Sequence, residues 1–406
     1  MTQSEQTKRE PGQMYKELSA SHIADVLPLA RYAHSVRPSE SNSVSEWLTD
    51  SVKAGKRLFG VYDPEETQLV ACWLLHPYTM RFREDLVSMG GVGLVSSRPD
   101  QRGQGNIRFM MARALETMRE SGHAVSALYP FHIGFYRRYG WESFTEWMRY
   151  EISPGTLDVL DSHPAVITQE LVFPDAASKA FYNDYARAHY NFALRDDIHW
   201  RARLRLWGDE QIARGVVKAE RHGKVEGLMG YTLFHKHGAD SPVLNISLFA
   251  STDEAIKQAL LLYLKRQSHQ VRKIELHLPL DEPLWPYLND YASATKLQQL
   301  AMIRIIDLAM LDGLRITAPD TALCIEVTDA QAAWNNGPWT LTVHDSVLHV
   351  EQGGVPVLQS GIGPLSAVLS GYANVAEMLA CGKMAARPGY NGEDLPKETT
   401  LLVDFF

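Results

Sequence analysis

Hydrophobic and polar positions along the first part of the chain follow the periods of both helices and strands. Apolar residues recur at helical spacing in two stretches, His22–Ala33 and Asn106–Ser121, which predicts two amphipathic helices. Two runs of strand-forming residues, Leu58–Tyr62 and Leu69–Leu75, flank an Asp-Pro turn and predict a hairpin. A glycine-rich run, Ser88–Ser97, predicts a further strand ahead of the second helix.

A shorter series of elements is expected to complete this first domain. Ala124–Tyr129 has the pattern of a short strand, and Phe131–Tyr139 that of a short helix. Gly140 and Trp141 follow as a turn, and a closing strand is predicted near Met148–Ile152. The first domain is therefore expected to end near residue 155.

The middle of the chain repeats this layout in a weaker form. Val243–Ala250 predicts a strand, Asp253–Gln267 a helix and Lys273–Leu278 a strand, which echoes Ser88–Tyr129 and indicates a duplicated architecture. The turn Ser251–Glu254 has no glycine and places two carboxylates where an anion would bind. This second copy is therefore not expected to bind a phosphate.

From about residue 290 the pattern changes to short strands separated by glycine-containing turns. These strands are predicted at Leu323–Val327, Trp339–Val343, Val347–Val350 and Val355–Leu358. A helical stretch, Leu365–Leu379, and an apolar, strand-like end, Thr399–Phe406, follow. The expected organisation is an α/β domain over residues 1–155, a related domain over 156–290 and an α+β domain over 291–406.

Composition indicates a globular protein and narrows the classes of ligand. The chain has 406 residues, of which 45% are hydrophobic and 22% charged, values that exclude a disordered, collagenous or membrane-embedded chain. Its net charge of −8 disfavours nucleic acid and attracts small cations. Cys72, Cys324 and Cys381 form no disulfide or zinc pattern. With a polar start and no spanning apolar run, we expect a soluble, cytoplasmic protein that needs no metal or membrane.

The strongest chemical signal is the loop Arg102–Ile107, between the predicted glycine-rich strand and the helix that follows. Its glycines, Gly103 and Gly105, would let the backbone approach an anion closely, and the helix dipole would attract a pyrophosphate. The loop is neither a dinucleotide fingerprint nor a Walker loop. Taken alone, it is equally compatible with a glycine-rich surface turn.

The order of elements around this loop resembles that of the GCN5-related N-acetyltransferases. The resemblance extends to Gly134–Trp141, with the sequence GFYRRYGW, to the acidic turn of the second copy, to Met302–Asp307 and to the aromatic C-terminus. Together these features resemble the "enhanced intracellular survival" acetyltransferases. The resemblance implies two fused acetyltransferase folds, the second degenerate, a sterol-carrier-like α+β domain and assembly as a hexamer.

The resemblance also assigns roles to residues around the loop, with acetyl-CoA as the co-substrate. It implies a pantetheine-binding strand end, a pyrophosphate-binding loop and two residues beside the thiol. The strand end that would bind pantetheine consists of Val95, Ser96 and Ser97. The loop that would bind the pyrophosphate consists of Arg102, Gly103, Gln104, Gly105, Asn106, Ile107 and Arg108. The two residues beside the thiol would be Phe131 and His132. Ile107 stands where the family usually has Gly or Ala.

Acetyl transfer to an amine requires two proton transfers, one from the attacking ammonium and one to the departing thiolate. The family motif places its general acid at Tyr136, and a phenol with a pKa near 10 stays protonated at neutral pH. A packing role for Tyr136 is the alternative, in which case Tyr139 would be the competing candidate for the acid. Geometry decides between the two tyrosines.

For the general base, the sequence offers no well-placed internal carboxylate. The resemblance implies that the α-carboxylate of the last residue, Phe406, takes this role. A frayed terminus is the alternative, but the apolar segment Leu401–Phe406 would expose large side chains if it were free. We therefore expect this segment to be buried and docked.

The function predicted from these features is N-acetylation of a primary amine on a small polycation. Relatives acetylate aminoglycosides, but Phe405 stands where an acidic residue would grip such a substrate, and Asp404 lies one step back. Trp47 is either a wall of the amine pocket or a core anchor. The alternatives are transfer to a polyamine, a peptide or a protein lysine, and, in a different class, a lipid- or small-molecule-binding protein built around the third domain.

Overall fold

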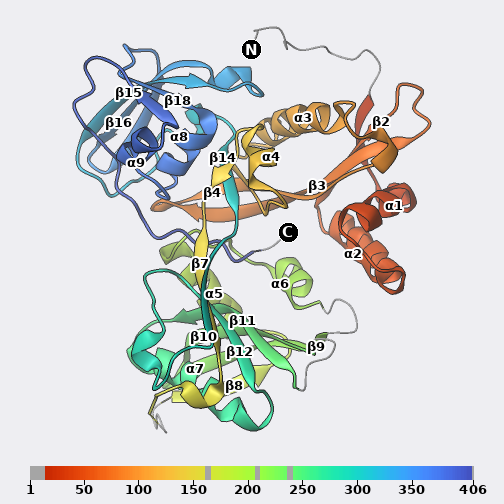
Figure 1. The fold of residues 1–406 in the computed structure, drawn as a ribbon, viewed down its shortest axis with the longest axis vertical. Coiled ribbons are helices and arrows are strands. Elements are labelled where there is room, and N and C mark those ends of the chain that lie inside the picture. The colour runs from red at the N-terminus through yellow and green to blue at the C-terminus, as the bar shows by residue number, and fades with distance from the viewer. Residues whose placement is uncertain (1–13, 161–165, 206–210, 236–240, 405–406) are drawn as a thin grey trace. The chain divides into compact units, whose positions relative to one another are not determined.

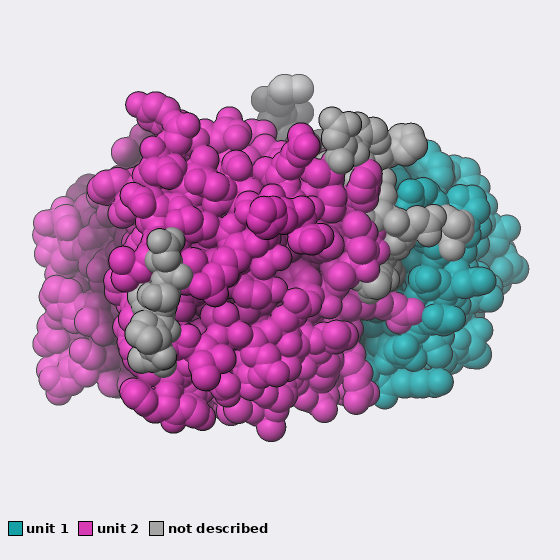
Figure 2. All heavy atoms as spheres, turned by 90° about the horizontal axis from the view of Figure 1, so that it is seen from below, with its two compact units in different colours: residues 1–77, 90–122, 406 teal, residues 78–89, 123–405 magenta. Residues whose placement is uncertain are grey.

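The computed structural model describes residues 14–160, 166–205, 211–235 and 241–404. Within this part of the chain the strands form three β-sheets, and helices pack on them (Figure 1). By their internal contacts the described residues form two compact units, which Figure 2 shows in different colours. Residues 14–77 and 90–122 belong to the first unit, and the other described residues belong to the second.

The first sheet has the strand order β1-β2-β3-β4-β5-β14-β6. Its strands are β1 (Met14–Leu18), β2 (Arg57–Tyr62), β3 (Leu69–Phe82), β4 (Asp85–Ser97), β5 (Val125–Leu128), β14 (Met302–Ile305) and β6 (Glu142–Ser143). The predicted hairpin is confirmed, because β2 pairs antiparallel with β3 from Arg57 opposite Leu75 to Tyr62 opposite Leu69.

The described residues of the first domain form four α-helices, α1 (Ile23–Ala33), α2 (Ser41–Lys53), α3 (Asn106–Glu120) and α4 (Ile133–Arg137). Three of them, α1, α3 and α4, were predicted from the apolar spacing. Helix α3 buries Met110, Met111, Leu115 and Met118 on one face, as its apolar spacing requires. Gly122, in the left-handed region with φ of +75°, follows its end.

The strand expected to close the first domain lies elsewhere. β7 (Glu146–Ile152) pairs with β12 (Lys273–Leu278) and β13 (Ala294–Gln299) in the second sheet. In exchange β14, which lies within the domain expected over residues 291–406, inserts between β5 and β6 of the first sheet. The boundaries expected near residues 155 and 290 therefore do not separate the first two sheets, because each sheet takes a strand from beyond its expected domain.

The second sheet has the order β13-β7-β12-β11-β10-β9-β8. The remaining elements of this domain are β8 (Val166–Leu171), β9 (Gln211–Arg221), β10 (Lys224–Phe234), β11 (Val243–Ser251), α5 (Ala176–Ala188), α6 (Asp197–Leu204) and α7 (Glu254–Lys265). Neighbouring strand residues face opposite sides, as the pleat requires. Val217 packs in the cluster that contains Leu260 of α7, whereas Val216 packs in the cluster that contains Tyr182 of α5.

The third sheet has the order β17-β16-β15-β18-β19. Its elements are β15 (Thr321–Thr328), β16 (Gly337–His344), β17 (Val347–Gln352), β18 (Leu358–Gly361), β19 (Met384–Ala386), α8 (Ile362–Leu369) and α9 (Val375–Ala380). The single helix expected over Leu365–Leu379 is two helices. Gly371, with φ of +85°, follows α8, and the Asn374 side chain caps α9 by accepting from Glu377 N at 2.8 Å.

A buried histidine in the second sheet makes stability depend on pH. His277 on β12 lies 4.0 Å from the Trp147 ring, and its Nδ1 contacts the carbonyl oxygen of Ile246 at 2.9 Å. Burial lowers the pKa of His277 to about 4, below the 6.5 of a free histidine. As the pH falls, the histidine of the unfolded chain takes up a proton near pH 6.5, whereas buried His277 in the folded chain does so only near pH 4. The stability that neutral His277 provides above pH 6.5 is therefore lost as the pH falls towards 4.

We therefore expect His277 alone to cost about 2 kcal/mol of unfolding free energy between pH 7.5 and pH 5. Urea unfolding at both pH values, for the native chain and for His277→Gln, measures this difference. His344→Gln is the control, because His344 is exposed and the pKa of its ring is raised by Asp320 rather than lowered. An equal pH slope in the native chain and His277→Gln would contradict the assignment.

Candidate active site

The glycine loop lies in the first unit, between the end of β4 and the start of α3. Gly103 and Gly105 have φ of +78° and +83°, in the left-handed region that favours glycine. A Cβ built on either glycine would meet no atom within 4 Å, so open space lies over both. The loop therefore presents its backbone without covering side chains.

The amino end of α3 has no side-chain cap. Gly105 precedes the helix, and it has no side chain with which to cap the first N–H groups of α3. The loop is closed instead by Asn106, whose Nδ2 donates to the Gln101 carbonyl oxygen at 3.1 Å. Uncapped N–H groups and the helix dipole make this end of α3 suited to an anion such as a pyrophosphate.

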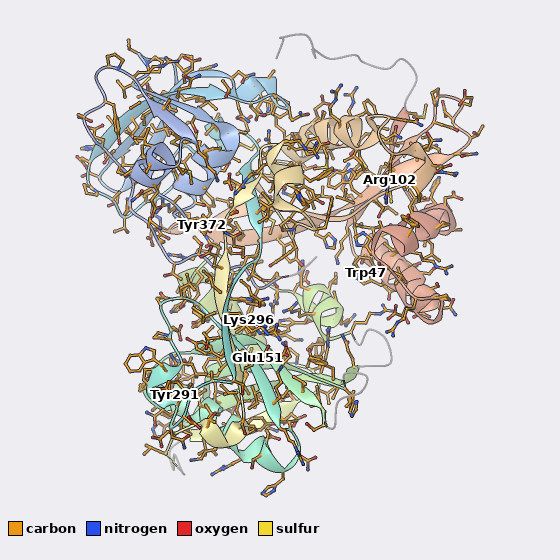
Figure 3. All side chains as sticks on the ribbon, in the orientation of Figure 1. Trp47, Arg102, Glu151, Tyr291, Lys296 and Tyr372 are labelled. Carbon is orange, nitrogen blue, oxygen red and sulfur yellow. The ribbon has the colours of Figure 1, made fainter. Side chains whose placement is uncertain are left out.

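Two arginines, Arg98 and Arg102, lie in or next to the loop and have different partners. Arg98 forms an ion pair with Asp100 at 2.8 Å, which fixes the turn that leads into the loop. Arg102 is exposed and lies 5.1 Å over the ring of Tyr32 on α1. Figure 3 labels Arg102 in this loop. Its exposed positive charge would attract an anionic ligand to the loop.

The end of β4 has a distortion that sequence reasoning missed. Leu94 has φ of +54°, which is unusual for a residue with a branched side chain inside a strand. The Ser96 hydroxyl donates to the Leu94 carbonyl oxygen at 3.0 Å and supports this bend. Val95 and Ser97, predicted to offer backbone groups to pantetheine, are half-buried beside it. No residue type in this run signals a left-handed leucine.

Trp47 lies on α2 and is half-buried. Figure 3 labels this residue. Its ring is 6.3 Å from that of His76, and the ammonium nitrogen of Lys56 lies 5.7 Å from its centroid. The ring thus already attracts a cation of the chain itself. Whether it also lines an amine pocket stays a prediction.

The predicted thiol-side residues lie in the second unit, around α4. His132 caps this helix, since its Nδ1 accepts from Phe135 N at 3.1 Å. Phe131 is 73% exposed and lies 5.5 Å from the Tyr136 ring. The loop after β5 thus leads directly into the helix that holds the predicted acid.

Tyr136 and Tyr139 are both buried, but their surroundings differ. Tyr136 packs edge-on against Phe131 and Phe135, and burial raises the pKa of its phenol above 10. Among the described residues none hydrogen-bonds to its hydroxyl. The phenol therefore stays protonated at neutral pH, as a general acid must, with its proton uncommitted within this part of the chain.

Tyr139, in contrast, belongs to a structural turn. Its carbonyl oxygen accepts from Arg304 Nη1 at 2.6 Å, and Arg304 forms a fully buried ion pair with Asp329 at 2.5 Å. Gly140 follows with φ of +86°, and a Cβ there would overlap the Arg304 side chain. Residues from β14 and the third domain thus fix the end of the acid-bearing segment.

The C-terminal segment is buried, as expected, but it is not a strand. Residues 399–404 have no regular secondary structure, and Leu401, Leu402 and Val403 are nearly inaccessible to solvent. Asp404 is also buried and pairs with Arg195 at 2.6 Å, so the structure gives this carboxylate an internal partner rather than an exposed position for a substrate. Phe405 and Phe406 lie outside the described residues.

The second copy of the loop carries a carboxylate at the amino end of its helix. Asp253 caps α7 by accepting from Ile256 N at 3.0 Å and forms an ion pair with Arg221 at 2.5 Å. A pyrophosphate at this end would meet a negative charge instead of free N–H groups. That this copy binds no phosphate stays a prediction.

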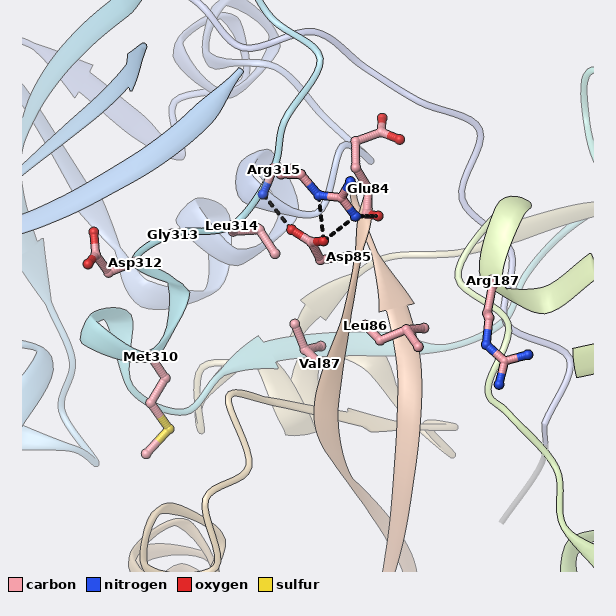
Figure 4. Close-up of a pocket in the computed structure, with 10 residues that line it drawn as sticks. All are labelled: Glu84, Asp85, Leu86, Val87, Arg187, Met310, Asp312, Gly313, Leu314 and Arg315. Atoms are coloured by element: carbon pink, nitrogen blue, oxygen red, sulfur yellow. Dashed lines mark hydrogen bonds and ion pairs between the residues drawn. The ribbon is translucent and has the colours of Figure 1, made fainter. Parts of the chain in front are cut away.

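A separate pocket of 660 Å³ lies within the second unit. Figure 4 shows its lining, which comes from residues 84–87 at the β3–β4 turn and the start of β4, from Arg187 and from the segment between Met310 and Arg315. Arg315 Nε donates to Asp85 at 2.7 Å across it. None of the residues predicted from the sequence lines this pocket.

Membrane-spanning helices and clustered metal ligands are both absent from the described residues. No helix in this part of the chain is long and apolar enough to cross a membrane. No group of three or more histidine, cysteine, aspartate or glutamate side chains within the same residues is arranged to hold a metal ion.

Comparisons of the sequence with family models assign each part of the chain to a domain family. Acetyltransferase (GNAT) domain models match residues 14–144 and residues 192–305. A sterol carrier protein domain model matches residues 308–396. No curated protein matches the sequence.

Solved structures share the fold over nearly the whole chain. A GCN5-related N-acetyltransferase from Anabaena variabilis is 18% identical with a TM-score of 0.85, and a probable N-acyltransferase from Enterococcus faecalis is 21% identical with a TM-score of 0.83. Eis1 from Mycobacterium abscessus is 16% identical with a TM-score of 0.76. Each similarity covers 97% of this chain and 100% of the other. The chain is thus an N-acetyltransferase with two GNAT domains, a domain type that uses acetyl-CoA, and a C-terminal sterol-carrier-protein domain.

Proposed function

We propose that this chain transfers an acetyl group from acetyl-CoA to a primary amine of a small polycation, by direct attack of the amine. The observation that carries the proposal is the difference between the two GNAT domains. In the first, α3 begins with open glycines and no cap, whereas in the second Asp253 occupies the equivalent end of α7. One donor site per chain, in the first domain, follows from this difference.

The residues around the loop fit the anionic part of acetyl-CoA. The backbone of residues 103–108 would hold the pyrophosphate, with Arg102 adding charge, and Val95–Ser97 would pair with the pantetheine arm. When bound, acetyl-CoA supplies a thioester whose carbon accepts the amine and whose sulfur leaves. Exposed Phe131 and the capping His132 lie at the start of α4, and the resemblance assigns these two residues to the thiol end of acetyl-CoA.

Two groups of the chain would move the protons. The Tyr136 hydroxyl donates its proton to the sulfur as the carbon–sulfur bond breaks. The α-carboxylate of Phe406 accepts the proton of the attacking ammonium, directly or through a water. This pairing uses a phenol that burial keeps protonated and a carboxylate that is ionised at neutral pH.

The net charge of −8 favours a cationic acceptor, which includes an aminoglycoside, a polyamine or a lysine side chain. An aminoglycoside is the acceptor we propose, on the likeness to the survival acetyltransferases. Assembly as a hexamer and a cytoplasmic location stay predictions. Acetyl transfer to an aminoglycoside, a polyamine and a lysine peptide, followed by thiol release, ranks the three acceptors.

The donor site is tested by a charge placed in the loop. Acetyl-CoA should raise the melting temperature of the native chain, because a ligand selective for the folded state stabilises it. In Gly105→Glu this shift should vanish, since the carboxylate repels the pyrophosphate and the left-handed backbone is strained. Differential scanning fluorimetry with and without acetyl-CoA gives the measurement.

Gly122→Glu is the matched control for this substitution. Gly122 lies at the other end of α3, with a similar φ of +75° and equally open space around it. The strain should therefore be similar in the two variants, about 1–3 kcal/mol, while only Gly105→Glu places charge at the loop. An acetyl-CoA shift that survives in Gly105→Glu, or disappears in both, would contradict the assigned site.

A further inference from the structure

Another cavity of the second unit lies where the first GNAT domain meets the sterol-carrier-protein domain. Its volume is 440 Å³, which is within the range of cavities that bind small molecules. Its lining comes from the end of α4 and the turn into β6, from the end of β15 and the turn after it, from the start of α8 and from Lys383. None of the residues assigned above to acetyl-CoA lines this junction cavity.

The lining of the junction cavity carries more positive than negative charge. Its charged side chains are three cations and two carboxylates: Arg137, Arg138, Lys383, Glu142 and Asp329. Asp329 is already neutralised, because it forms the fully buried ion pair with Arg304. Three cations against one remaining carboxylate leave two positive charges, in a chain whose net charge is −8. An anion is therefore the ligand that this lining favours.

Glu142 holds two of the three cations in place. It is 3% exposed and accepts from Arg137 Nη2 at 2.7 Å and from Lys383 Nζ at 2.9 Å. Burial raises the pKa of Glu142, but these hydrogen bonds outweigh burial and leave the pKa below its usual range. The carboxylate is thus ionised at neutral pH, and it fixes both cations at the wall of the cavity.

Two further donors in the lining have no acceptor among the described residues. Arg138 is exposed, its guanidinium lies 5.2 Å from the centroid of the Phe135 ring, and it pairs with no carboxylate in this part of the chain. Trp141 is fully buried, and no described residue accepts from its indole Nε1. A buried donor without an acceptor is costly, so an acceptor bound in the cavity would relieve this cost.

The amino end of α8 belongs to the same lining. Gly361 precedes this helix and has no side chain with which to cap it. A Cβ on Gly363 would lie 3.2 Å from the Gly140 carbonyl oxygen, so the start of α8 approaches the turn after α4 closely. The positive end of the helix dipole adds to the attraction that the side chains exert on an anion.

The uncharged part of the lining is largely apolar. Ala330, Ile362 and Pro364 contribute to it. An inorganic anion would leave this surface in water, whereas an organic body would cover it. We propose that the junction cavity binds a small organic carboxylate, whose oxygens accept from Arg138 and Trp141 and whose apolar body packs against Pro364. Such a ligand would contact the first GNAT domain and the sterol-carrier-protein domain at once.

Isothermal titration calorimetry of the full chain tests the class of ligand. Benzoate is the probe, benzamide is its neutral isostere, and inorganic phosphate is an anion without an apolar body. Benzoate should bind at one site per chain, and benzamide should bind about 10-fold more weakly, because it makes no charge-assisted hydrogen bond. Phosphate should also bind more weakly than benzoate. Saturating acetyl-CoA should leave the benzoate affinity unchanged, because no residue assigned to acetyl-CoA lines the cavity.

Two pairs of variants test the place of binding. Ala330→Glu adds a negative charge to the lining, and Ala322→Glu is its control, because Ala322 is also exposed but lies on β15 outside the lining. Arg138→Gln removes the unpaired cation, and Arg272→Gln is its control, because Arg272 is exposed and pairs with no carboxylate among the described residues. The two cavity variants should weaken benzoate binding about 10-fold, whereas both controls should bind as the native chain does.

Trp141→Phe keeps an aromatic ring and removes the indole N–H, so it should weaken benzoate binding by roughly several-fold. The melting temperature of each variant without ligand shows that it is folded.

Several results would overturn the inference. Undetectable benzoate binding at millimolar concentrations, or equal binding of benzamide, would remove the carboxylate as the ligand. Tighter binding of phosphate than of benzoate would show that the apolar lining plays no part. Native affinity in Ala330→Glu and Arg138→Gln, or displacement of benzoate by acetyl-CoA, would place the probe elsewhere. None of these measurements depends on acetyl transfer, so the inference can fail or stand independently of the proposed function.

Discussion

Replacement of Tyr136 by phenylalanine is expected to lower kcat about 10²-fold with little change in KM for acetyl-CoA. The hydroxyl is needed as negative charge develops on sulfur, and general-acid catalysis contributes on this scale. Burial raises the pKa of this phenol, so the acid is available throughout the neutral range. Steady-state kinetics with saturating amine, at several acetyl-CoA concentrations, separates kcat from KM.

Tyr139→Phe is the internal control for this prediction. Tyr139 lies three residues later, is similarly buried, and contributes its backbone carbonyl oxygen to the contact with Arg304. Phenylalanine keeps that carbonyl and the ring, so the loss of activity should be small. Equal losses in the two variants would show that both tyrosines act by packing, and Tyr136 would no longer be the acid.

Elements defined by local sequence were predicted well. The period of apolar residues places α3 within one residue of its observed bounds, and the Asp-Pro turn identifies the β2–β3 hairpin. Both depend on neighbours in sequence, for which spacing and turn chemistry are sufficient. Gly103 and Gly105 before α3 were predicted to leave the backbone accessible, and their left-handed φ values are ones that glycine favours.

The pairing of strands that are far apart in the sequence could not be predicted in this way. β7 and β14 have ordinary strand patterns, and nothing in either run specifies which sheet it joins. Their exchange depends on partners about 125 to 180 residues away, as in Met302 opposite Leu128 and Glu146 opposite Gln299. The left-handed conformation of Leu94 could not be predicted from the sequence either, because it is imposed by the surrounding structure.

The C-terminal segment combines, within six residues, a feature that the sequence predicts with one that it does not. Its apolar character predicts burial, which the structure has at Leu401 and Val403. The ion pair of Asp404 depends on Arg195, more than two hundred residues earlier, so no local pattern around Asp404 indicated this partner. A buried ionic partner is visible only after folding brings the two charges together.

A single glycine added after Phe406 is expected to reduce kcat by about 10² or more while the protein stays folded. The α-carboxylate has a pKa near 3.3–3.7, so it is ionised at neutral pH and can accept the amine proton. One extra residue moves that charge by roughly 3.3 Å, beyond the reach of a hydrogen bond set for the original position. The anchors at Leu401, Leu402 and Asp404 lie before the change and should keep the segment docked.

The control is the same glycine added at the amino terminus, which leaves the terminal carboxylate in place. Melting temperature and the acetyl-CoA shift should match the native chain in both proteins, because neither the core nor the donor loop is altered. Only the C-terminal extension should lose turnover, and a longer C-terminal tag should behave like the single glycine, since both remove the charge from its site. If the extended proteins fold, bind acetyl-CoA and turn over at the native rate, the base is not the terminal carboxylate, and a water or an internal group must accept the proton.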